Sequence, residues 1–328
     1  MPQTLLVTGA TGSAGSNVCR LARQAGYAVR ALVRPGSDTS PLEAMGAQPV
    51  VGDVTDLASL LAAAPGATGI IHCAARIGGT WSTATADDFM SVNLWGSVNV
   101  LDAAERCGVD RVVMLLSGII LDPSQTKTEN SPIVAISPSD SPYTAAKRAA
   151  YYEGMARAAR GREVNFVVPA GIYGATPFID RALVPTIFTG TLLMAARGEL
   201  KRYLPMPIAW VTAQDVAAVS LRALERGRRG RRYLAMGRPE DVCSLPEFCN
   251  RFLELAGLEN RVAEVDGSAT ADPEFGSMVK LIRPSYPEPY HDCGATTEEL
   301  GVEPTSLAQG LASTLRWLRA NRRMPASD

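Results

Sequence analysis

Tyr143 and Lys147 lie four residues apart in a segment, 143–160, whose pattern predicts a helix. Residues at that spacing share one face of a helix, so we expect the phenol and the ammonium group to be neighbours. A free phenol has a pKa of about 10, which is too high for proton exchange near neutral pH, and a nearby cation favours its ionised form. The pair is therefore a candidate for moving a proton to or from a substrate oxygen.

Ser117 lies 26 residues before Tyr143, just after a predicted strand. Its hydroxyl is placed to hold the same substrate oxygen, and the alternative is a hydroxyl that only caps the strand end. Asn93, on the helix predicted before that strand, is a candidate to support Lys147 through its main chain or a water. The alternative for Asn93 is a buried helix contact. We predict Ser117, Tyr143, Lys147 and Asn93 as the catalytic group.

A glycine-rich loop follows the first predicted strand and opens the first predicted helix. Gly9 allows a sharp turn, Gly12 lets a pyrophosphate approach the backbone, and Gly15 lets the helix pack closely on the sheet. The free N–H groups at the helix start then bind phosphate oxygens. The spacing of three and three differs from the usual dinucleotide fingerprint. The predicted phosphate-binding residues are Gly9, Thr11, Gly12, Ser13, Ala14 and Gly15.

The end of the second predicted strand decides between the two nicotinamide cofactors. An acidic residue there would bind the ribose 2′-hydroxyl of NAD. This sequence has Arg34, with Ser37 as a second donor, and a guanidinium suits a 2′-phosphate. Asp38 lies four residues further on, around the loop. We therefore favour NADP over NAD, the alternative being a solvated Arg34.

Two further strand ends are expected to open on the same crevice. Asp53 can accept a hydrogen bond from adenine and Val54 can cover its ring, unless Asp53 only caps a helix. Small residues after His72 leave room for the cofactor backbone, whereas His72 itself is expected to pack beneath the loop. The predicted cofactor contacts at these two ends are Asp53, Val54, Cys73, Ala74 and Ala75.

Short apolar runs alternate with helical patterns through the first half of the chain, which predicts βαβ units and a doubly wound parallel sheet. The predicted strands are 4–7, 28–33, 49–51, 70–73, 112–116 and 164–168, and the predicted helices are 14–25, 57–64, 87–107 and 143–160. After Pro169 the alternation breaks, with further helices at 214–226, 245–255 and 306–321 and a strand at 232–235. We expect a Rossmann domain in residues 1–170. Residues 171–328 would form a smaller, interleaved substrate region, and about 208–240 would return to the core.

Composition excludes several classes of protein. The 328 residues are 46% hydrophobic and 20% charged, which excludes intrinsic disorder. The formal net charge of −1 argues against a nucleic-acid-binding protein. No Cys or His cluster has metal-ligand spacing, and no apolar run approaches the ~20 residues that span a bilayer. We therefore expect no metal, no membrane segment and a cytoplasmic location.

Taken together, these motifs resemble the extended short-chain dehydrogenase/reductase family, in the NAD-dependent epimerase/dehydratase group. Pro142 before Tyr143 and the residues from Pro169 to Gly174 add to the resemblance, which covers nearly the whole chain. It implies a Rossmann fold, a C-terminal substrate region and a dimer formed through two helices per subunit. It also adds Pro169, Gly171 and Ile172 to the cofactor contacts.

Three functions remain open on the sequence. The favoured one is an NAD(P)-dependent oxidoreductase that moves hydride between nicotinamide and a carbonyl or secondary alcohol, similar to the dihydroflavonol reductase and 3β-hydroxysteroid dehydrogenase branch. The alternative is a nucleotide-sugar epimerase or dehydratase with retained NAD, and the third is a cofactor-sensing protein without catalysis. An apolar pocket for a small substrate supports the first. Its predicted residues are Ile77, Trp81, Ile172, Tyr173, Phe178, Leu183 and Trp210.

Overall fold

The computed structural model describes residues 3–78, 81–266, 268, 272, 274–275 and 285–324. Within these residues, a seven-stranded parallel sheet has the order β10-β6-β5-β4-β1-β2-β3. Its strands are β1 (Thr4–Thr8), β2 (Ala28–Val33), β3 (Gln48–Val51), β4 (Gly69–His72), β5 (Arg111–Leu115), β6 (Glu163–Pro169) and β10 (Arg232–Ala235). The middle residues of the central strands are apolar and buried, as burial on both faces requires.

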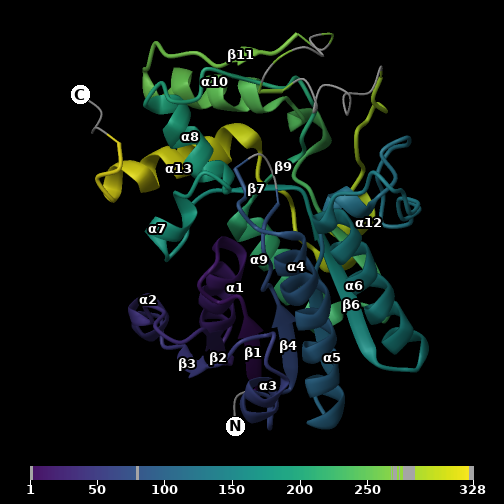
Figure 1. Ribbon diagram of the computed structural model, residues 1–328. Coiled ribbons are helices and arrows are strands. Elements are labelled where there is room, and N and C mark those ends of the chain that lie inside the picture. The colour runs from purple at the N-terminus through teal and green to yellow at the C-terminus, as the bar shows by residue number, and fades with distance from the viewer. Residues whose placement is uncertain are drawn as a thin grey trace.

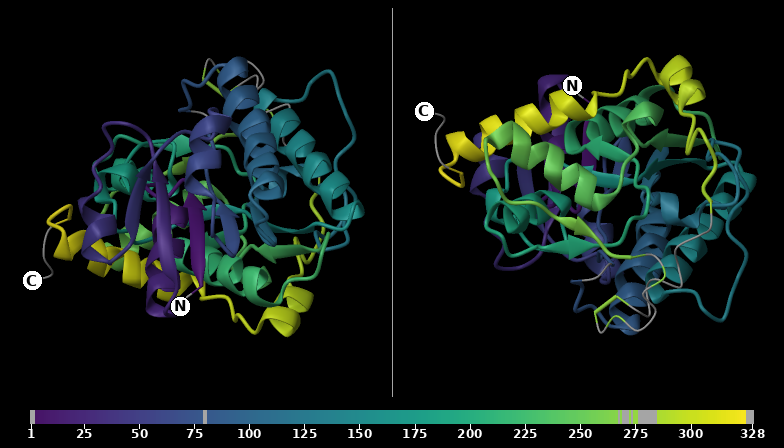
Figure 2. Two further views of the ribbon diagram at one scale, coloured as in Figure 1. Left: turned by 90° about the horizontal axis from the view of Figure 1, so that it is seen from below. Right: turned by 90° about the horizontal axis from the view of Figure 1, so that it is seen from above.

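Helices cover both faces of this sheet (Figure 2). The core on one face includes buried residues of α3 (Leu57–Ala63), α5 (Gly96–Arg106) and α6 (Pro142–Ala159). The core on the other includes residues of α1 (Ser13–Gln24), α2 (Ser40–Ala44), α9 (Ala213–Arg226) and α12 (Gly294–Leu300). The doubly wound Rossmann-type fold that the sequence predicts is therefore confirmed.

The sheet changes direction of winding between β1 and β4. The chain moves outward from β1 to β3 and then crosses back to β4 on the other side of β1. In open parallel sheets this switch point leaves a crevice at the carboxyl ends of the strands, where ligands bind. The fold therefore predicts a ligand site at the loops after β1 and β4.

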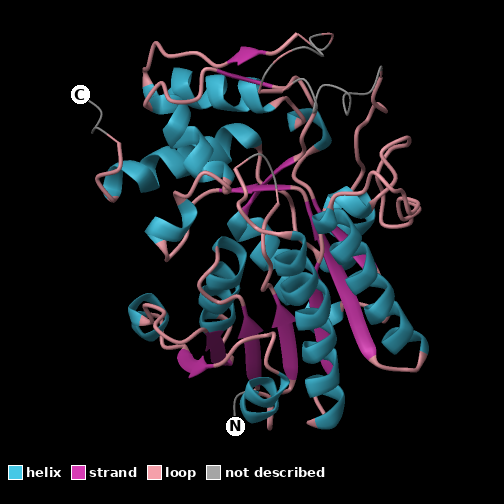
Figure 3. Ribbon diagram, in the orientation of Figure 1, coloured by secondary structure: helices cyan, strands magenta, loops and turns pink. Residues whose placement is uncertain are grey.

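A second group of elements, here called the cap, lies beyond those carboxyl ends (Figures 1 and 3). It has its own apolar core, and a parallel pair of strands, β7 (Gly171–Tyr173) and β9 (Trp210–Thr212), lies at its base. The elements of the cap are α7 (Ile179–Ala182), α8 (Phe188–Ala196), β8 (Arg202–Tyr203), α10 (Leu245–Ala256), β11 (Ala263–Glu264) and α13 (Leu307–Ala320).

Most predicted elements agree with the observed ones to within one or two residues, but the predicted helix 87–107 does not form continuously. It consists of α4 (Ala86–Phe89), a π-helical segment (Met90–Trp95) and α5. A π turn is only slightly wider than an α turn, so the spacing of the apolar residues stays nearly the same. The sequence pattern could therefore not distinguish the π segment from an α-helix. The short elements α2, β7, β8, β9, β11, α7, α8 and α12 were not predicted. No helix in the described ranges has the length and apolarity needed to cross a bilayer.

Candidate functional site

The loops after β1 and β4 touch each other at the switch point. Gly9 has a φ of +67°, and a Cβ there would lie 2.6 Å from the nitrogen of Ala74. A Cβ on Gly15 would lie 2.2 Å from the Gly9 oxygen. Both positions therefore require glycine, one for its conformation and its neighbour, the other for close packing of α1.

The start of α1 is suited to an anion. Gly12 is its N-cap and supplies no side-chain acceptor, and the first turn contains no acidic residue. The hydroxyl oxygen of Ser13 is buried and has no hydrogen-bond partner in the described part of the chain. Buried polar atoms are normally paired, so this hydroxyl and the free N–H groups fit a phosphate group.

A buried hydrogen-bond chain lies beneath the loops. The ring of His72 bonds to the Thr8 hydroxyl through Nδ1 (2.7 Å) and to the Ser97 hydroxyl through Nε2 (3.0 Å). Ser97 donates to the main-chain oxygen of Asn93 (2.8 Å). Burial, with the Lys147 charge, lowers the pKa of His72 to about 3, so the ring is neutral. As expected, His72 packs beneath the site.

Arg34, just after β2, is exposed, and its guanidinium has no hydrogen bond or ion pair with the residues that the structure describes. Ser37 donates its main-chain N–H to the Arg34 oxygen (3.1 Å), which closes a turn. Asp38 accepts from the Ser40 N–H (3.0 Å) and hydroxyl (2.7 Å), and these bonds lower the pKa of its carboxyl. One oxygen of this carboxylate is therefore already engaged locally.

At the end of β3, Asp53 and Val54 both have local contacts. Asp53 accepts from the N–H (2.9 Å) and hydroxyl (2.8 Å) of Thr55, so one of its oxygens closes a local turn. Val54 is 6% exposed and lies in the core, where a Cβ on Gly96 would meet its side chain at 2.8 Å. The structure thus places Val54 in the sheet–helix core, and the adenine contact of these two residues stays a prediction.

Three of the four predicted catalytic residues are brought together at the ends of β5 and α6. Ser117 hydrogen-bonds to Tyr143, which counteracts the rise in the phenol pKa that burial causes. Lys147 is 5% exposed and donates to the Leu115 oxygen (3.1 Å). Burial lowers the pKa of Lys147 to about 8, and burial raises that of nearby Cys73 to about 12. The neutral thiol and the cationic ammonium thus lie together near the end of β4.

Local capping fixes this arrangement. Ser141 is the N-cap of α6 and accepts from the Thr144 N–H (3.1 Å), and Pro142 begins the helix. This start sets the phase that places Tyr143 and Lys147 on one side. Ser117 also accepts from the Ile119 N–H (3.4 Å) in the turn Gly118–Ile120, so the capping alternative holds beside the bond to Tyr143.

Asn93 is fully buried and holds the loop after β4 by two bonds. Its side-chain oxygen accepts from the Arg76 N–H (2.8 Å), and its amide donates to the Arg76 oxygen (3.0 Å). Its support of Lys147 through the main chain or a water stays a prediction. Gly78 lies two residues after Arg76, and a Cβ there would lie 3.1 Å from the Cβ and Cγ of Tyr143. Gly78 was not predicted from the sequence, because it belongs to no motif.

The predicted substrate residues divide into two groups. Tyr173, Phe178 and Trp210 are 1%, 7% and 2% exposed and belong to apolar cores. Trp210 stacks on Phe248 at 3.8 Å and donates its indole N–H to the Cys243 oxygen (3.1 Å). These three aromatic side chains therefore pack in the hydrophobic cores instead of lining a substrate pocket.

The second group remains accessible. Ile77 is 42% exposed, and Trp81, Ile172 and Leu183 are partly buried. Pro169 ends β6, and Gly171 and Ile172 form part of β7, at the same carboxyl edge as the loops described above. These positions agree with a site at that edge.

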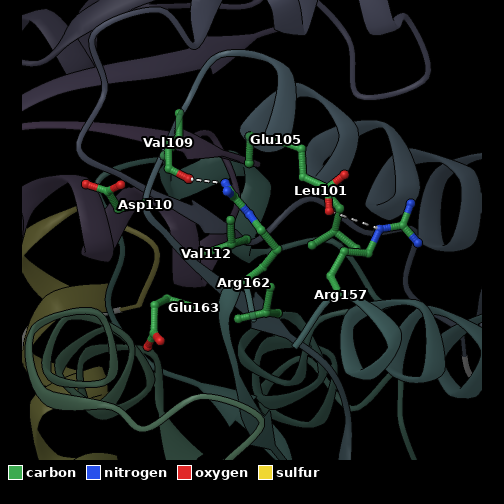
Figure 4. Close-up of a pocket in the computed structure, with 10 residues that line it drawn as sticks. Leu101, Glu105, Val109, Asp110, Val112, Arg157, Arg162 and Glu163 are labelled. Carbon is green, nitrogen blue, oxygen red and sulfur yellow. Dashed lines mark hydrogen bonds and ion pairs between the residues drawn. The ribbon is translucent and has the colours of Figure 1, made fainter. Parts of the chain in front are cut away.

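The cavity drawn in Figure 4 does not belong to this site. Its volume is ≈ 10 Å³, and it is lined by Val109 and Asp110 before β5 and by Arg162 and Glu163 at the start of β6. It therefore lies at the opposite, amino-terminal edge of the sheet and barely holds one water. In the described ranges, no cluster of three or more His, Cys, Asp or Glu residues could hold a metal.

Known proteins resemble the chain over nearly its whole length. "Sterol demethylase protein B" of Methylococcus capsulatus is 29% identical, over 96% of this chain and 98% of that protein. A putative dihydroflavonol 4-reductase of Synechocystis is 27% identical, over 97% and 95%. The structure of DesIV, a dTDP-glucose 4,6-dehydratase of Streptomyces venezuelae with NAD and TYD bound, has a TM-score of 0.80 at 25% identity, covering 98% of each chain.

The model of the NAD-dependent epimerase/dehydratase family matches residues 5–235, which include the glycine loop, Ser117, Tyr143 and Lys147. The resemblance stated from the motifs is thus confirmed, and with it an NAD(P)-dependent oxidoreductase of the extended short-chain type. The chain belongs to the NAD-dependent epimerase/dehydratase family.

Proposed function

We propose that the protein is an NADP(H)-dependent reductase of a carbonyl group, or dehydrogenase of the corresponding secondary alcohol, on a small and largely apolar substrate. The observation that carries the proposal is the grouping of Ser117, Tyr143 and Lys147 beside the loops after β1 and β4. This grouping joins a proton-transfer site to a phosphate cradle, which is what hydride transfer to a carbonyl requires.

The residues divide the work as follows. When bound, the cofactor supplies or accepts the hydride. Ser117 and Tyr143 hold the substrate oxygen, and the hydroxyl of Tyr143 gives a proton to that oxygen in reduction or takes it in oxidation. Burial raises the pKa of Tyr143, so the phenol is protonated at neutral pH and ready for reduction. Lys147, with a pKa of about 8, is mainly cationic at pH 7 and stabilises the phenolate that proton donation leaves.

The start of α1 would hold the pyrophosphate, through free N–H groups and the unpartnered Ser13 hydroxyl. Arg34 and Ser37 would bind the ribose 2′-phosphate. One oxygen of the Asp38 carboxylate is engaged with Ser40, whereas the exposed guanidinium of Arg34 has no partner among the described residues. These observations support NADP over NAD. The further contacts proposed are Thr11, Ala14, Asp53, Cys73, Ala74, Ala75, Pro169, Gly171 and Ile172.

We also propose a division of labour along the chain. Residues 1–170 would bind the cofactor and 171–328 mainly the substrate, with 208–240 returning to the core. The pairing of β10 with β6 and the packing of α9 against the sheet support this return. Substrate residues would come from the accessible group, Ile77, Trp81 and Ile172.

A homodimer is part of the proposal. Trp95, in the π-helical segment, is 58% exposed, and Tyr152, on α6, is 53% exposed. Large aromatic side chains on two neighbouring helices are favourable contacts for a second copy. Light scattering on the purified protein should give twice the mass of 34.8 kDa.

The epimerase or dehydratase alternative has a clear test. Ser117 is followed by Gly118, Ile119 and Ile120, so no acidic side chain follows it closely to assist dehydration. The purified protein should be free of bound cofactor and should oxidise added NADPH with a panel of ketones, a dihydroflavonol and cinnamoyl-CoA. Tightly retained NAD, together with turnover of a dTDP-sugar and none of these carbonyls, would support the alternative and reject the reductase.

A further inference from the structure

The loop after β4 links the catalytic tyrosine to the cap. In the function proposed above it supplies only individual contacts, from Ala74 and Ala75 to the cofactor and from Ile77 and Trp81 to the substrate. Its described parts are residues 74–78 and 81–82. Three of its contacts lead, one after another, from Tyr143 to the cap.

The base of the loop is fixed. Asn93 holds both the N–H and the oxygen of Arg76. The hydroxyl of Ser82 donates to the Ile77 oxygen (2.8 Å), which brings the two sides of the loop together. This bond holds Ser82, and with it the adjacent Trp81, to Ile77.

Gly78 packs directly on the base of the Tyr143 side chain. A Cβ at this position would lie 3.1 Å from both the Cβ and the Cγ of Tyr143, which is closer than carbon atoms normally approach. The φ of Gly78 is outside the left-handed region, so alanine is compatible with the backbone and would act through this contact. The ring of Tyr143 also meets Phe89 edge-on at 5.7 Å, and this second contact limits how far the ring can shift.

Trp81 reaches the cap. Its ring stacks on Tyr203 with 5.5 Å between centroids and 28° between planes. Tyr203 lies in β8, which pairs with β11, and the main-chain oxygen of Tyr203 accepts from the Val265 N–H (2.8 Å). Phe275 meets Tyr203 edge-on at 5.4 Å. The stacked rings of Trp81 and Tyr203, here called the aromatic wall, are thus anchored in the cap. The bond between Ser82 and Ile77 ties this wall to the part of the loop that contains Gly78.

From these contacts we infer that this loop acts on the proposed reaction in two separable ways, one on turnover and one on substrate specificity. Gly78 is a positioning residue that fixes the phenol of Tyr143, and Trp81, stacked on Tyr203, is the wall that binds an apolar part of the substrate distant from the reacting carbonyl. This inference rests on the proposed carbonyl reduction and deepens it. A substrate would extend from Tyr143 toward Trp81.

Two ketones with the same reacting group test this inference, 2-butanone and 4-phenyl-2-butanone, which adds a ring two carbons from the carbonyl. Gly78→Ala should lower kcat about ten-fold or more for both, because small misplacements of a catalytic group are costly. NADPH affinity should stay within two-fold. Gly294→Ala is the matched control, since its Cβ would also meet an atom at 3.1 Å, an oxygen of the exposed Asp292 side chain far from the site.

Trp81→Ala should act on KM instead. We expect KM for 4-phenyl-2-butanone to rise roughly two- to ten-fold, the value of an aromatic contact, while 2-butanone is unaffected. Trp81→Phe keeps a ring and should restore most of the loss.

The possible failures can be told apart. Wild-type protein that reduces neither these ketones nor any carbonyl of the panel would contradict the proposed function and this inference with it. Reduction by wild type, with kcat of Gly78→Ala within two-fold or an equal KM change for both ketones in Trp81→Ala, would overturn the inference alone.

Discussion

Replacing Arg34 by alanine should weaken NADPH binding and leave NADH binding nearly unchanged. A charge-assisted hydrogen bond contributes about 1.5–3 kcal/mol, or roughly ten- to a hundred-fold in affinity. The Arg34 side chain is exposed, so solvent and salt screen its charge and we expect a loss near ten-fold. Arg34→Asp should go further, since it repels the phosphate and offers an acceptor to a bare ribose hydroxyl.

Titration of both cofactors by fluorescence, at low and high ionic strength, measures the effect. Asp38→Ala is the matched control from the same loop. Because the Asp38 carboxylate already accepts two bonds from Ser40, its removal should change the affinity for either cofactor less than two-fold. Tighter binding of NADH than NADPH by the wild type would refute the reasoning, as would an Arg34→Ala variant that binds both cofactors as the wild type does.

Three further substitutions test the rest of the site. Tyr143→Phe should lower kcat by about 10²–10⁴-fold with cofactor affinity within a few-fold, and a variant that kept a tenth of wild-type kcat would exclude proton transfer by the phenol. Lys147→Met should remove a pH-dependent part of the stability, because the pKa of Lys147 is about 8 in the folded protein and higher in the unfolded chain. Between these two pKa values the unfolded chain binds more protons, so the free energy of unfolding of the wild type should increase relative to that of the variant as pH rises. Urea unfolding at pH 7 and pH 10 measures this, and a constant difference would contradict it. Gly15→Ala should abolish tight cofactor binding or folding, because its Cβ would lie 2.2 Å from the Gly9 oxygen, and wild-type affinity and melting temperature in this variant would be the contrary result.

The sequence predicted the Rossmann half of the molecule well because that half repeats one local rule. The parallel strands are mainly apolar, and the turns after β1 and β4 contain glycine or small residues, as at Gly9 and Ala74. The four-residue spacing of Tyr143 and Lys147 brings their side chains to one face as soon as the segment forms a helix. Local patterns therefore sufficed for the sheet, the phosphate loop and the catalytic pair.

The remainder depended on contacts that no local pattern records. Trp210 and Tyr173 are aromatic residues near the site in sequence order, but their burial is decided by Phe248, on a distant helix. Gly78 is one glycine among 29 until its contact with Tyr143 is known. Composition tells that a side chain is apolar, whereas only the assembled fold tells whether it contacts a core or a substrate.

The β7–β9 pair has a consequence for how this architecture can change. Gly171 pairs with Trp210 and Tyr173 with Thr212, so the chain leaves and re-enters the body of the protein at adjacent points. Neighbouring strands lie only about 4.8 Å apart, and the entropy of closing the intervening excursion, 174–209, grows slowly with its length. Ala175 and Thr176 hydrogen-bond to Asn17 and Ser16 of α1, and Phe178 lies in the core beside the sheet, so residues 175–178 must be kept. The rest of the excursion, which contains α7, α8 and β8 of the cap, could be lengthened, shortened or exchanged while the β7–β9 pair holds its two ends in place.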